Sequence, residues 1–596
     1  MWAYHYYDEL SSELLYSYPK SSITKIESGL PSNEWEIFAF SDITRSKTTD
    51  IIYKLKNSNL LSVYHYSKEK KRYYMMQNLT FSGMDIKSIQ PIDFEMNGYN
   101  DLLITHSKDL QLPYHLSLVK NQKGYLNPEI QDLGITTNNV PFIFDFNQSG
   151  SFDILYIEPE TLKLRFLFNK NMRFESLKHS SFFYSIAAAQ LFDQDSINIV
   201  AITEKTSEKS KISIFNYSKK QNMWKVVHEF DAPPNIGQLS IGDFDGDGYL
   251  DVVFAVYPAP QRPSLFEIDK NDTDSKSERK NAIARIANFL RPSDNSPMIS
   301  QARLKTNEKR LIDMSYLCFM FNGPKGFTSD TKCSNKTSSI QFIVDNILPN
   351  SQPHVADLTL SGNPDILIGV VDPEGKKQTQ LILNQPCKTC LSREMMLVSH
   401  SSFPGTGSFF DIFNSGKLGI ITDEASYHST LAEDSFFLKV SALNGPCLDN
   451  CKKKQRKDKR FPRPPPLATV YNGATMKITY TDKQGLKHHA IGSQRSTNGI
   501  SLPYYVFGLG ENVHYVENLS VQTNDFDAWT WILPSSDVFT SSNHQIRVFL
   551  MYKIRVFYVV FGFVILLLTL EMFVLIFSRK EDKEDKKEAE QILPLF

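Results

Sequence analysis

Residues 243–251 constrain the fold of this chain more than any other stretch, because they concentrate negative charge in a short turn. They read Asp-Phe-Asp-Gly-Asp-Gly-Tyr-Leu-Asp and precede an apolar run, Val-Val-Phe. Two like charges about 4 Å apart repel by roughly 4 kcal/mol at an effective dielectric of ~20. Ca2+ offsets such repulsion by taking about six to eight oxygen ligands. The sequence therefore predicts a Ca2+ site, with the backbone carbonyl oxygen of Tyr249 and four carboxylates as ligands: Asp243, Asp245, Asp247 and Asp251.

The flanks of this loop favour a β-hairpin over a pair of helices. An EF-hand loop begins with the same D-x-D-x-D-G spacing, but it has Glu at its twelfth position and helices on both sides. Here the twelfth position is Phe254, and the run Leu-Asp-Val-Val-Phe-Ala-Val is typical of a strand. The alternative interpretation is an acidic surface turn that holds no metal.

Weaker copies of the same loop recur along the chain. Each begins at an acidic residue and precedes an apolar strand; the copies begin at Asp42, Asp93, Asp145, Asp193, Asp357 and Asp411. The loops lie about 50 residues apart, except for 114 residues (357 − 243) before the sixth. A spacing of about 50 residues fits four strands with their turns, the content of one propeller blade. We therefore expect an all-β fold, with a seven-bladed β-propeller over residues 1–447.

The copies differ in the ligands that they offer to a metal. The second loop is a possible second Ca2+ site, because it carries Asp93, Glu95, Asn97 and Asp101. The third, with Asn147 between two acids, is also possible. The first and sixth loops have Thr and Ser where carboxylates would sit, and their hydroxyls are expected to close the turn by local hydrogen bonds. The fourth and seventh are expected to be empty.

Composition divides the rest of the chain into further segments. Residues 261–308 are predicted to form a disordered insertion within the propeller, because part of the segment is rich in charged and polar residues. Residues 448–466 are a basic and proline-rich linker. Residues 467–545 show short alternating strands and are expected to form a small β-sandwich.

The six cysteines favour disulfides in an oxidising compartment. They lie in three locally spaced couples: Cys318 and Cys333, Cys387 and Cys390, Cys447 and Cys451. The last four could instead form a tetrahedral zinc site. The compartment is also supported by five predicted N-glycosylation sites, which are Asn78, Asn216, Asn271, Asn335 and Asn518.

One segment near the C-terminus is long and apolar enough to be a transmembrane helix. Residues 556–577 are almost entirely apolar, which suffices to cross a hydrocarbon core of ~30 Å. A short charged tail, residues 578–596, follows and is expected in the cytoplasm. The first eight residues have neither the charged nor the apolar region of a signal peptide, so we expect the start of this sequence to be incomplete or mispredicted.

Charge and motifs argue against two classes of function. The formal net charge is −1 over 596 residues, and basic patches with interleaved aromatics are missing, so a nucleic-acid partner is not expected. The sequence shows no Ser-His-Asp arrangement, phosphate-binding loop or paired catalytic carboxylates, so we expect no enzyme activity and no small-molecule substrate.

Two motifs carry a family resemblance. The loop at 243–251 resembles the FG-GAP calcium repeat of integrin α-subunit propellers, and residues 493–510, ending in Phe-Gly-Leu-Gly, resemble the C-terminal domain named for the ASPIC and UnbV proteins. Together with one C-terminal span and a short tail, the chain resembles the T-cell immunomodulatory protein (linkin) family.

The resemblance implies a single-pass type I membrane glycoprotein of the cell surface or secretory pathway, with an extracellular or luminal N-terminal region. Its propeller would bind a partner protein in adhesion or immunomodulation. Two alternatives remain open at this stage, a luminal assembly or quality-control factor and a propeller hydrolase.

Overall fold

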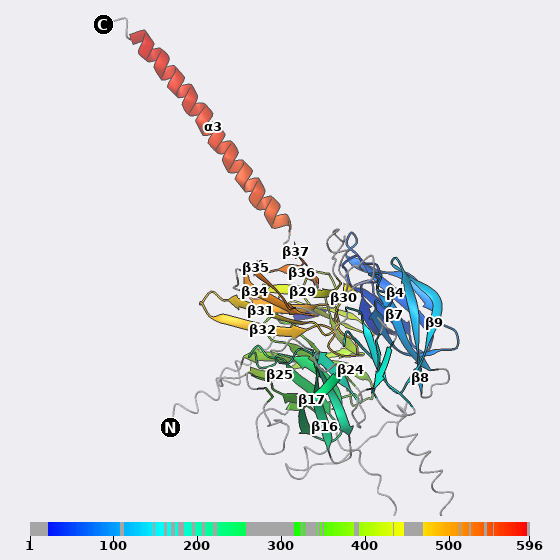
Figure 1. Ribbon diagram of the computed structural model, residues 1–596. Helices are drawn as coiled ribbons and strands as arrows, with labels where there is room; N and C mark the ends of the chain where they lie inside the picture. Colours follow the sequence, from blue (N-terminus) through cyan, green and yellow to red (C-terminus); the bar gives the residue numbers. More distant parts are fainter. Residues whose placement is uncertain are drawn as a thin grey trace, which may run out of the picture. The chain divides into compact units, whose positions relative to one another are not determined.

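The computed structural model places most of the chain between residues 22 and 592 (Figure 1). Within these limits, the segments that it does not describe are 108–112, 147–149, 160–163, 169–172, 177–183, 193–196, 206–208, 219–222, 258–314, 324–325, 328–341, 344–345, 349–350, 387–392, 433, 446–468, 512, 514, 524–525, 542–544 and 552–553. The predicted insertion at 261–308 and the predicted linker at 448–466 therefore lie outside the described residues.

Seven four-stranded antiparallel sheets account for most of the described strands. Six of them use four consecutive strands each. Their bounds are β2 Trp35–Ser41, β3 Asp50–Leu55, β4 Leu60–Ser67 and β5 Arg72–Thr80; β6 Asp85–Ile92, β7 Asp101–Ser107, β8 Tyr114–Gln122 and β9 Tyr125–Thr137; β10 Phe142–Phe144, β11 Asp153–Ile157, β12 Leu164–Phe168 and β13 Arg173–Ser176; β14 Ile186–Ala189, β15 Asn198–Lys205, β16 Ser210–Ser218 and β17 Met223–Ala232; β18 Ile236–Gly242, β19 Asp251–Val256, β20 Tyr316–Met320 and β21 Phe342–Ile343; β22 His354–Ala356, β23 Asp365–Val371, β24 Lys377–Pro386 and β25 Arg393–Pro404.

The seventh sheet joins the two ends of this region. It contains β26 (Gly407–Phe410), β27 (Gly419–Thr422), β28 (Ser426–Ser429) and, as its fourth strand, β1 (Ile23–Ile26). β1 pairs antiparallel with β28, and the Oγ atoms of Ser28 and Ser426 lie 2.7 Å apart. The first described strand is thus tied to the last strands of the propeller region.

Apolar side chains seal each sheet against its neighbours. The second strands of the sheets are largely buried, and β7 and β19 are buried along their whole length, as expected for strands covered on both faces. One cluster joins the last sheet to the first through Phe410, Ile421 and Phe40. The rings of Phe40 and Phe410 lie 4.8 Å apart, so the two ends of the series pack together.

A β-sandwich follows the seven sheets. One layer orders β30 (Thr469–Val470), β29 (Phe436–Asn444), β36 (Ser536–Ser541) and β37 (Gln545–Leu550), with β33 (Tyr505–Gly510) also paired to β29; the other orders β32 (Lys487–Ser493), β31 (Thr475–Thr481), β34 (Val516–Gln522) and β35 (Phe526–Ile532). Figure 1 shows these two layers in yellow and orange.

The predicted boundary at residue 447 requires a correction, because β29 belongs to the sandwich. It runs parallel to β36 and antiparallel to β33, and among the described strands it pairs with none from the propeller. The sandwich therefore begins at Phe436. Its apolar side chains, Leu438 and Val440, enter the same core as Phe507 and Val538, so burial in the second domain decides where this strand pairs.

Residues 494–503, here called the channel segment, connect β32 to β33 and reach among the innermost strands of the propeller. Ser496 accepts a hydrogen bond at its carbonyl oxygen from the amide of Ala188 at 2.7 Å, and Thr497 forms a β-bridge with Ala187. Farther along, the Asn498 carbonyl accepts a hydrogen bond from Gln90 Nε2 at 3.1 Å. Arg495, fully buried, donates a hydrogen bond to the carbonyl oxygen of Phe40.

A second compact unit, residues 550–596, contains one helix, α3 (Ile554–Ile592). Part of α3 is long and apolar enough to cross a membrane, by length and composition. The expected fold class is confirmed in its main elements: a strand-dominated, propeller-like region, a β-sandwich and one apolar C-terminal helix. The expected span at 556–577 lies inside α3, and the charged tail continues that helix.

Candidate metal centre

The fifth loop connects β18 to β19, and backbone hydrogen bonds to its first carboxylate shape it. Asp243 accepts hydrogen bonds from the amides of Gly246 at 2.8 Å and Gly248 at 3.0 Å. Both glycines have positive φ, 77° and 82°, a conformation that costs glycine little. Glycine therefore suits both positions at which the backbone turns around Asp243.

The last carboxylate of the loop, that of Asp251, ties it to two other parts of the fold. Its two oxygens accept hydrogen bonds from the amides of Phe244 and Asn322, both at 2.8 Å. Asn322, two residues after β20, in turn donates from Nδ2 to the carbonyl oxygen of Leu191 at 2.7 Å, in the loop between β14 and β15 of the preceding sheet. Through Asn322, Asp251 thus links its own loop to the neighbouring sheet by hydrogen bonds that need no metal.

Three predicted ligands lie close together. Carboxylate oxygens of Asp243, Asp245 and Asp247 all lie within 4.8 Å of one another, with Asp243 buried and the other two exposed. Among the described residues, this is the one such grouping of three acidic, His or Cys side chains. Burial, with the charges of Asp247 and Asp245, raises the pKa of Asp243 to about 7.

Two of the other three predicted carboxylates show the same effect. Partial desolvation raises the pKa of the largely exposed Asp247 to about 6, and the charge of Asp245 contributes to the shift. The pKa of Asp251 rises well above its usual range because of burial and the Asp245 charge. The charges of neighbouring aspartates contribute, after burial, to all three raised pKa values, and a bound cation would offset that repulsion.

The loop fits a hard divalent cation by the chemistry of its donors. Carboxylate oxygens are the ligands that Ca2+ prefers, and each oxygen that accepts one backbone hydrogen bond keeps a second lone pair. Asp245 and Asp247 would supply the exposed ligands, and Asp243 the buried one. Ligation by Asp251 and by the carbonyl oxygen of Tyr249 stays a prediction.

The possible second site, in the loop between β6 and β7, repeats the backbone pattern with fewer charges. Asp93 accepts from the amides of Asn97 and Gly98, both at 2.9 Å, and burial raises the pKa of Asp93 to about 7. Asp101 accepts from the amide of Asn121. Glu95, however, forms an ion pair with Lys120, so a lysine already offsets one of the expected ligand charges.

The remaining loops keep the turn with other groups. In the sixth, Thr359 donates from Oγ1 to Asp365 Oδ2 at 3.2 Å, so a hydroxyl does close the turn as expected. In the fourth, the closing position holds Asn198, whose Oδ1 accepts from the amide of Leu191 at 3.0 Å. Asp193 lies outside the described residues. The repeat pattern does not reveal Asn198, because the pattern is defined by acidic residues and an amide carries no charge.

The seventh loop contains an internal ammonium group. Lys439, on β29, places Nζ 3.0 Å from Asp411 Oδ2 and 3.1 Å from Asn414 Oδ1. The lysine is buried, and the nearby carboxylates of Asp411 and Asp537 keep its pKa above the usual range despite burial. A loop without a closing acid thus receives a cation from the sandwich.

The sandwich covers the same face of the propeller at other loops. An added Cβ on Gly248 would lie 3.7 Å from Lys477 Nζ and 3.3 Å from His489 Cβ, which places β31 and β32 over the fifth loop. Gly508 donates its amide to Asp357 Oδ2 at 3.0 Å, so β33 contacts the sixth loop. The Phe-Gly-Leu-Gly motif is therefore a contact between the domains.

The other predicted sites are only partly described. Cys318 is buried and disulfide-bonded. The remaining five cysteines lie outside the described residues, as do Asn147, Asn271 and Asn335. Asn78 and Asn518 are exposed on strands β5 and β34, and Asn216 is half-buried on β16.

Fold and site together define a class of protein: a propeller with an acidic loop cluster, capped by a β-sandwich and followed by an apolar helix. The family model described as "ITFG1, C2 domain" matches residues 466–548, which include most of the sandwich. The chain is 24% identical to a T-cell immunomodulatory protein homolog of Plasmodium falciparum, over 93% of this chain and 86% of that protein. It is 22% identical to the T-cell immunomodulatory protein of Homo sapiens, over 84% of this chain and 80% of that protein.

These matches confirm the family resemblance: the chain is similar to the T-cell immunomodulatory proteins over most of its length. Solved structures are more distant. Drosophila Semaphorin 1b, extracellular domains 1–2, has a TM-score of 0.33 at 8% identity and covers 70% of this chain and 87% of that one. A luciferin-regenerating enzyme has a TM-score of 0.30 at 7% identity, with 64% and 96% covered. Scores this low carry no argument about function.

Proposed function

We propose that this membrane protein uses its propeller and sandwich as a Ca2+-stabilised ectodomain that binds a partner protein in adhesion or immunomodulation. The observation that carries the proposal is the acidic cluster of Asp243, Asp245 and Asp247 in the one loop that retains all of its carboxylates. The names of its relatives support an immunomodulatory role, and the apolar stretch of α3 supports a membrane anchor.

Calcium would act on stability, and through stability on binding. The fifth loop lies beneath Lys477 and His489 of the sandwich, so its conformation bears on how the two domains pack. A cation that offsets the repulsion of the three carboxylates would stabilise the folded ectodomain by mass action. In this proposal the metal is structural, and the partner binds elsewhere on the ectodomain.

The test uses the full chain in lipid nanodiscs. We expect addition of Ca2+ to raise the midpoint of thermal unfolding and EGTA to lower it, with Mg2+ less effective because it requires a tighter octahedral site. Cells that display the chain are then scored for Ca2+-dependent attachment to other cells. An ectodomain with neither Ca2+-dependent stability nor attachment would contradict the proposal.

Imaging of the tagged full chain separates the alternative of a luminal assembly factor. Surface staining in unpermeabilised cells is the expected result, whereas retention in the endoplasmic reticulum would favour the assembly factor.

A further inference from the structure

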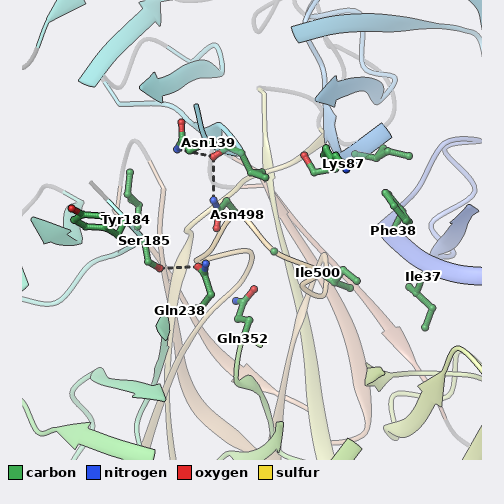
Figure 2. A pocket seen from close by; sticks show the side chains of 15 residues that line it. Ile37, Phe38, Lys87, Asn139, Tyr184, Ser185, Gln238, Gln352, Asn498 and Ile500 are labelled. Carbon is green, nitrogen blue, oxygen red and sulfur yellow. Dashed lines mark hydrogen bonds between the residues drawn. The ribbon is translucent and has the colours of Figure 1, made fainter. Parts of the chain in front are cut away.

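A cavity of about 360 Å3 lies at the end of the propeller channel away from the acidic loops (Figure 2). Its walls come from the beginnings of the innermost strands, such as Lys87 on β6 and Gln238 on β18, whereas the acidic loops follow the ends of these strands. Residues 498–500 of the channel segment line it as well. The channel segment thus closes the channel from the sandwich side and leaves a pocket on the other. The volume falls in the range of small-ligand pockets, about 300–1,000 Å3.

The lining mixes polar and apolar side chains and is nearly without charge. Among its described residues there is no Asp, Glu or His, and its one cation, Lys87, forms an ion pair with Asp85 at 2.6 Å. A charged ligand that entered this cavity would lose its hydration and find no strong counter-charge there, which costs free energy. The cavity selects for neutral ligands.

Side-chain amides give the cavity both donors and acceptors. The Oε1 atom of Gln238 accepts a hydrogen bond from Ser185 at 2.9 Å, so the Nε2 atom of the same amide is left to donate to other partners. Asn498 donates from Nδ2 to the carbonyl oxygen of Val140 at 3.2 Å, which leaves Oδ1 as an acceptor. Figure 2 shows Gln238 and Asn498 on adjacent walls, with Gln352 close by.

Aromatic surface lies beside these polar groups. Tyr184, just before β14, is 47% exposed, and Phe38 on β2 lines another wall. A ring offers a flat apolar face, and a phenol adds one hydroxyl group. A ligand that suits this lining has hydroxyl groups on its edge and an apolar face of C–H groups.

We propose that this cavity binds a neutral saccharide of one or two rings. Each sugar hydroxyl both donates and accepts, which matches the amides of Gln238 and Asn498. The C–H face of the ring would pack on Tyr184. The ligand is bound and not converted, and the site does not depend on the proposed Ca2+ loop, because the two lie at opposite ends of the innermost strands.

The experiment is saturation-transfer NMR on the full chain in nanodiscs. The probes are glucose, galactose, mannose, N-acetylglucosamine and their β-linked disaccharides, with sialic acid as the anionic comparison. We expect transfer to at least one neutral sugar, weaker transfer to sialic acid, and no loss on addition of EGTA at a temperature where the protein stays folded. If sugar binding survives EGTA but cells that display the chain fail to attach even in Ca2+, the proposed function is contradicted and the saccharide site is not.

Two variants test the site itself. We expect Gln238→Ala and Tyr184→Ala each to weaken the binding at least tenfold. The matched controls are Gln484→Ala, in an exposed turn of the sandwich, and Tyr125→Ala, 63% exposed on β9; both should bind as the parent does. The proposal is overturned if no neutral sugar binds at millimolar concentration, if sialic acid binds best, or if a folded Tyr184→Ala protein binds unchanged.

Discussion

At the scale of single residues, the loops separate two roles of acidic side chains. The first and last positions, such as Asp243 and Asp251, accept backbone hydrogen bonds that shape the turn. The middle positions, Asp245 and Asp247, are exposed and add the charge that a cation would offset. Copies that lost the middle charges keep the turn, as Asp357 does by accepting the amides of Ser361 and Gly362.

The substitution Asp245→Asn tests the second role. The amide of Asp247 donates a hydrogen bond to Asp245 Oδ1 at 3.3 Å, and an Asn side chain can still accept it. The substitution therefore removes one negative charge and keeps this hydrogen bond. We expect Ca2+ to bind at least tenfold more weakly, about 1.4 kcal/mol, as measured by isothermal titration calorimetry. Asp372→Asn, in a turn outside the acidic cluster, is the control and should bind Ca2+ as the parent does. Equal affinity in both variants would rule out the fifth loop as the site.

Lys439 tests a buried ion pair. Removal of one partner leaves Asp411 charged and buried, which typically costs about 3–5 kcal/mol. We expect Lys439→Met to lower the free energy of unfolding by an amount in that range, measured by urea denaturation. Lys376→Met, which removes the exposed pair with Glu374, should leave the unfolding midpoint unchanged. A Lys439→Met protein as stable as the parent would show that the pair does not stabilise the domain contact.

At the scale of elements, the contact between β33 and the sixth loop depends on a missing side chain. An added Cβ on Gly508 would lie 2.1 Å from the backbone carbon of Leu360 and 2.3 Å from Asp357 Oδ2, closer than any real contact. We expect Gly508→Ala to shift β33 from the loop and to lower the unfolding midpoint by several degrees in a thermal scan. Gly485→Ala is not a suitable control, because Gly485 has a positive φ that disfavours alanine. The comparison is instead Ala490→Ser, an ordinary core substitution at a buried position of the sandwich. Equal midpoints for Gly508→Ala and the parent would contradict the close contact.

The sixth loop also predicts a pH dependence. Burial and the Asp357 charge raise the pKa of Asp365 to about 8, from 3.8 in an unfolded chain. Between these values the folded state holds a proton that the unfolded state has lost, so this group's stabilising contribution falls as pH rises from about 4 to 8.

The fourth loop suggests the variant to compare, since Asn198 occupies the corresponding place there. We expect Asp365→Asn to flatten the decline of the unfolding midpoint between pH 5 and pH 8, measured in EGTA. The decline should not vanish, because Asp42 and Asp93 also have a raised pKa of about 7. An unchanged slope would show that Asp365 does not hold the proton.

At the scale of the whole molecule, the propeller and the sandwich form one compact unit up to Phe549. Residues 494–503 reach the innermost strands, and Lys439 and Gly508 contact two of the loops. We therefore expect one cooperative unfolding transition for this unit in calorimetry. A chain that ends at residue 435 should not yield a stable monomer, because its channel and loop face would be exposed. Two separate transitions would contradict this description.

The sequence predicts the repeated parts of this fold better than the contacts between them. Acidic turns before apolar strands mark the sheets, because the same local hydrogen bonds recur around residues such as Asp93 and Asp243. Pairing of β29 with β36, by contrast, depends on burial against residues about 100 positions away, which no local pattern reveals. The channel segment was missed for the same reason: residues 494–503 form hydrogen bonds mainly with distant strands. The cavity that it closes has no motif at all.

The pairing of β1 with β28 has a consequence for biosynthesis. The hydroxyls of Ser28 and Ser426 are separated by 398 positions, so the earliest described strand has no partner until the ribosome has made almost three-quarters of the protein. Until then the unpaired edge of β1 can pair with other chains and aggregate, and chaperones are most needed against such aggregation. Production of this protein should therefore be limited by how well the cell protects the nascent chain.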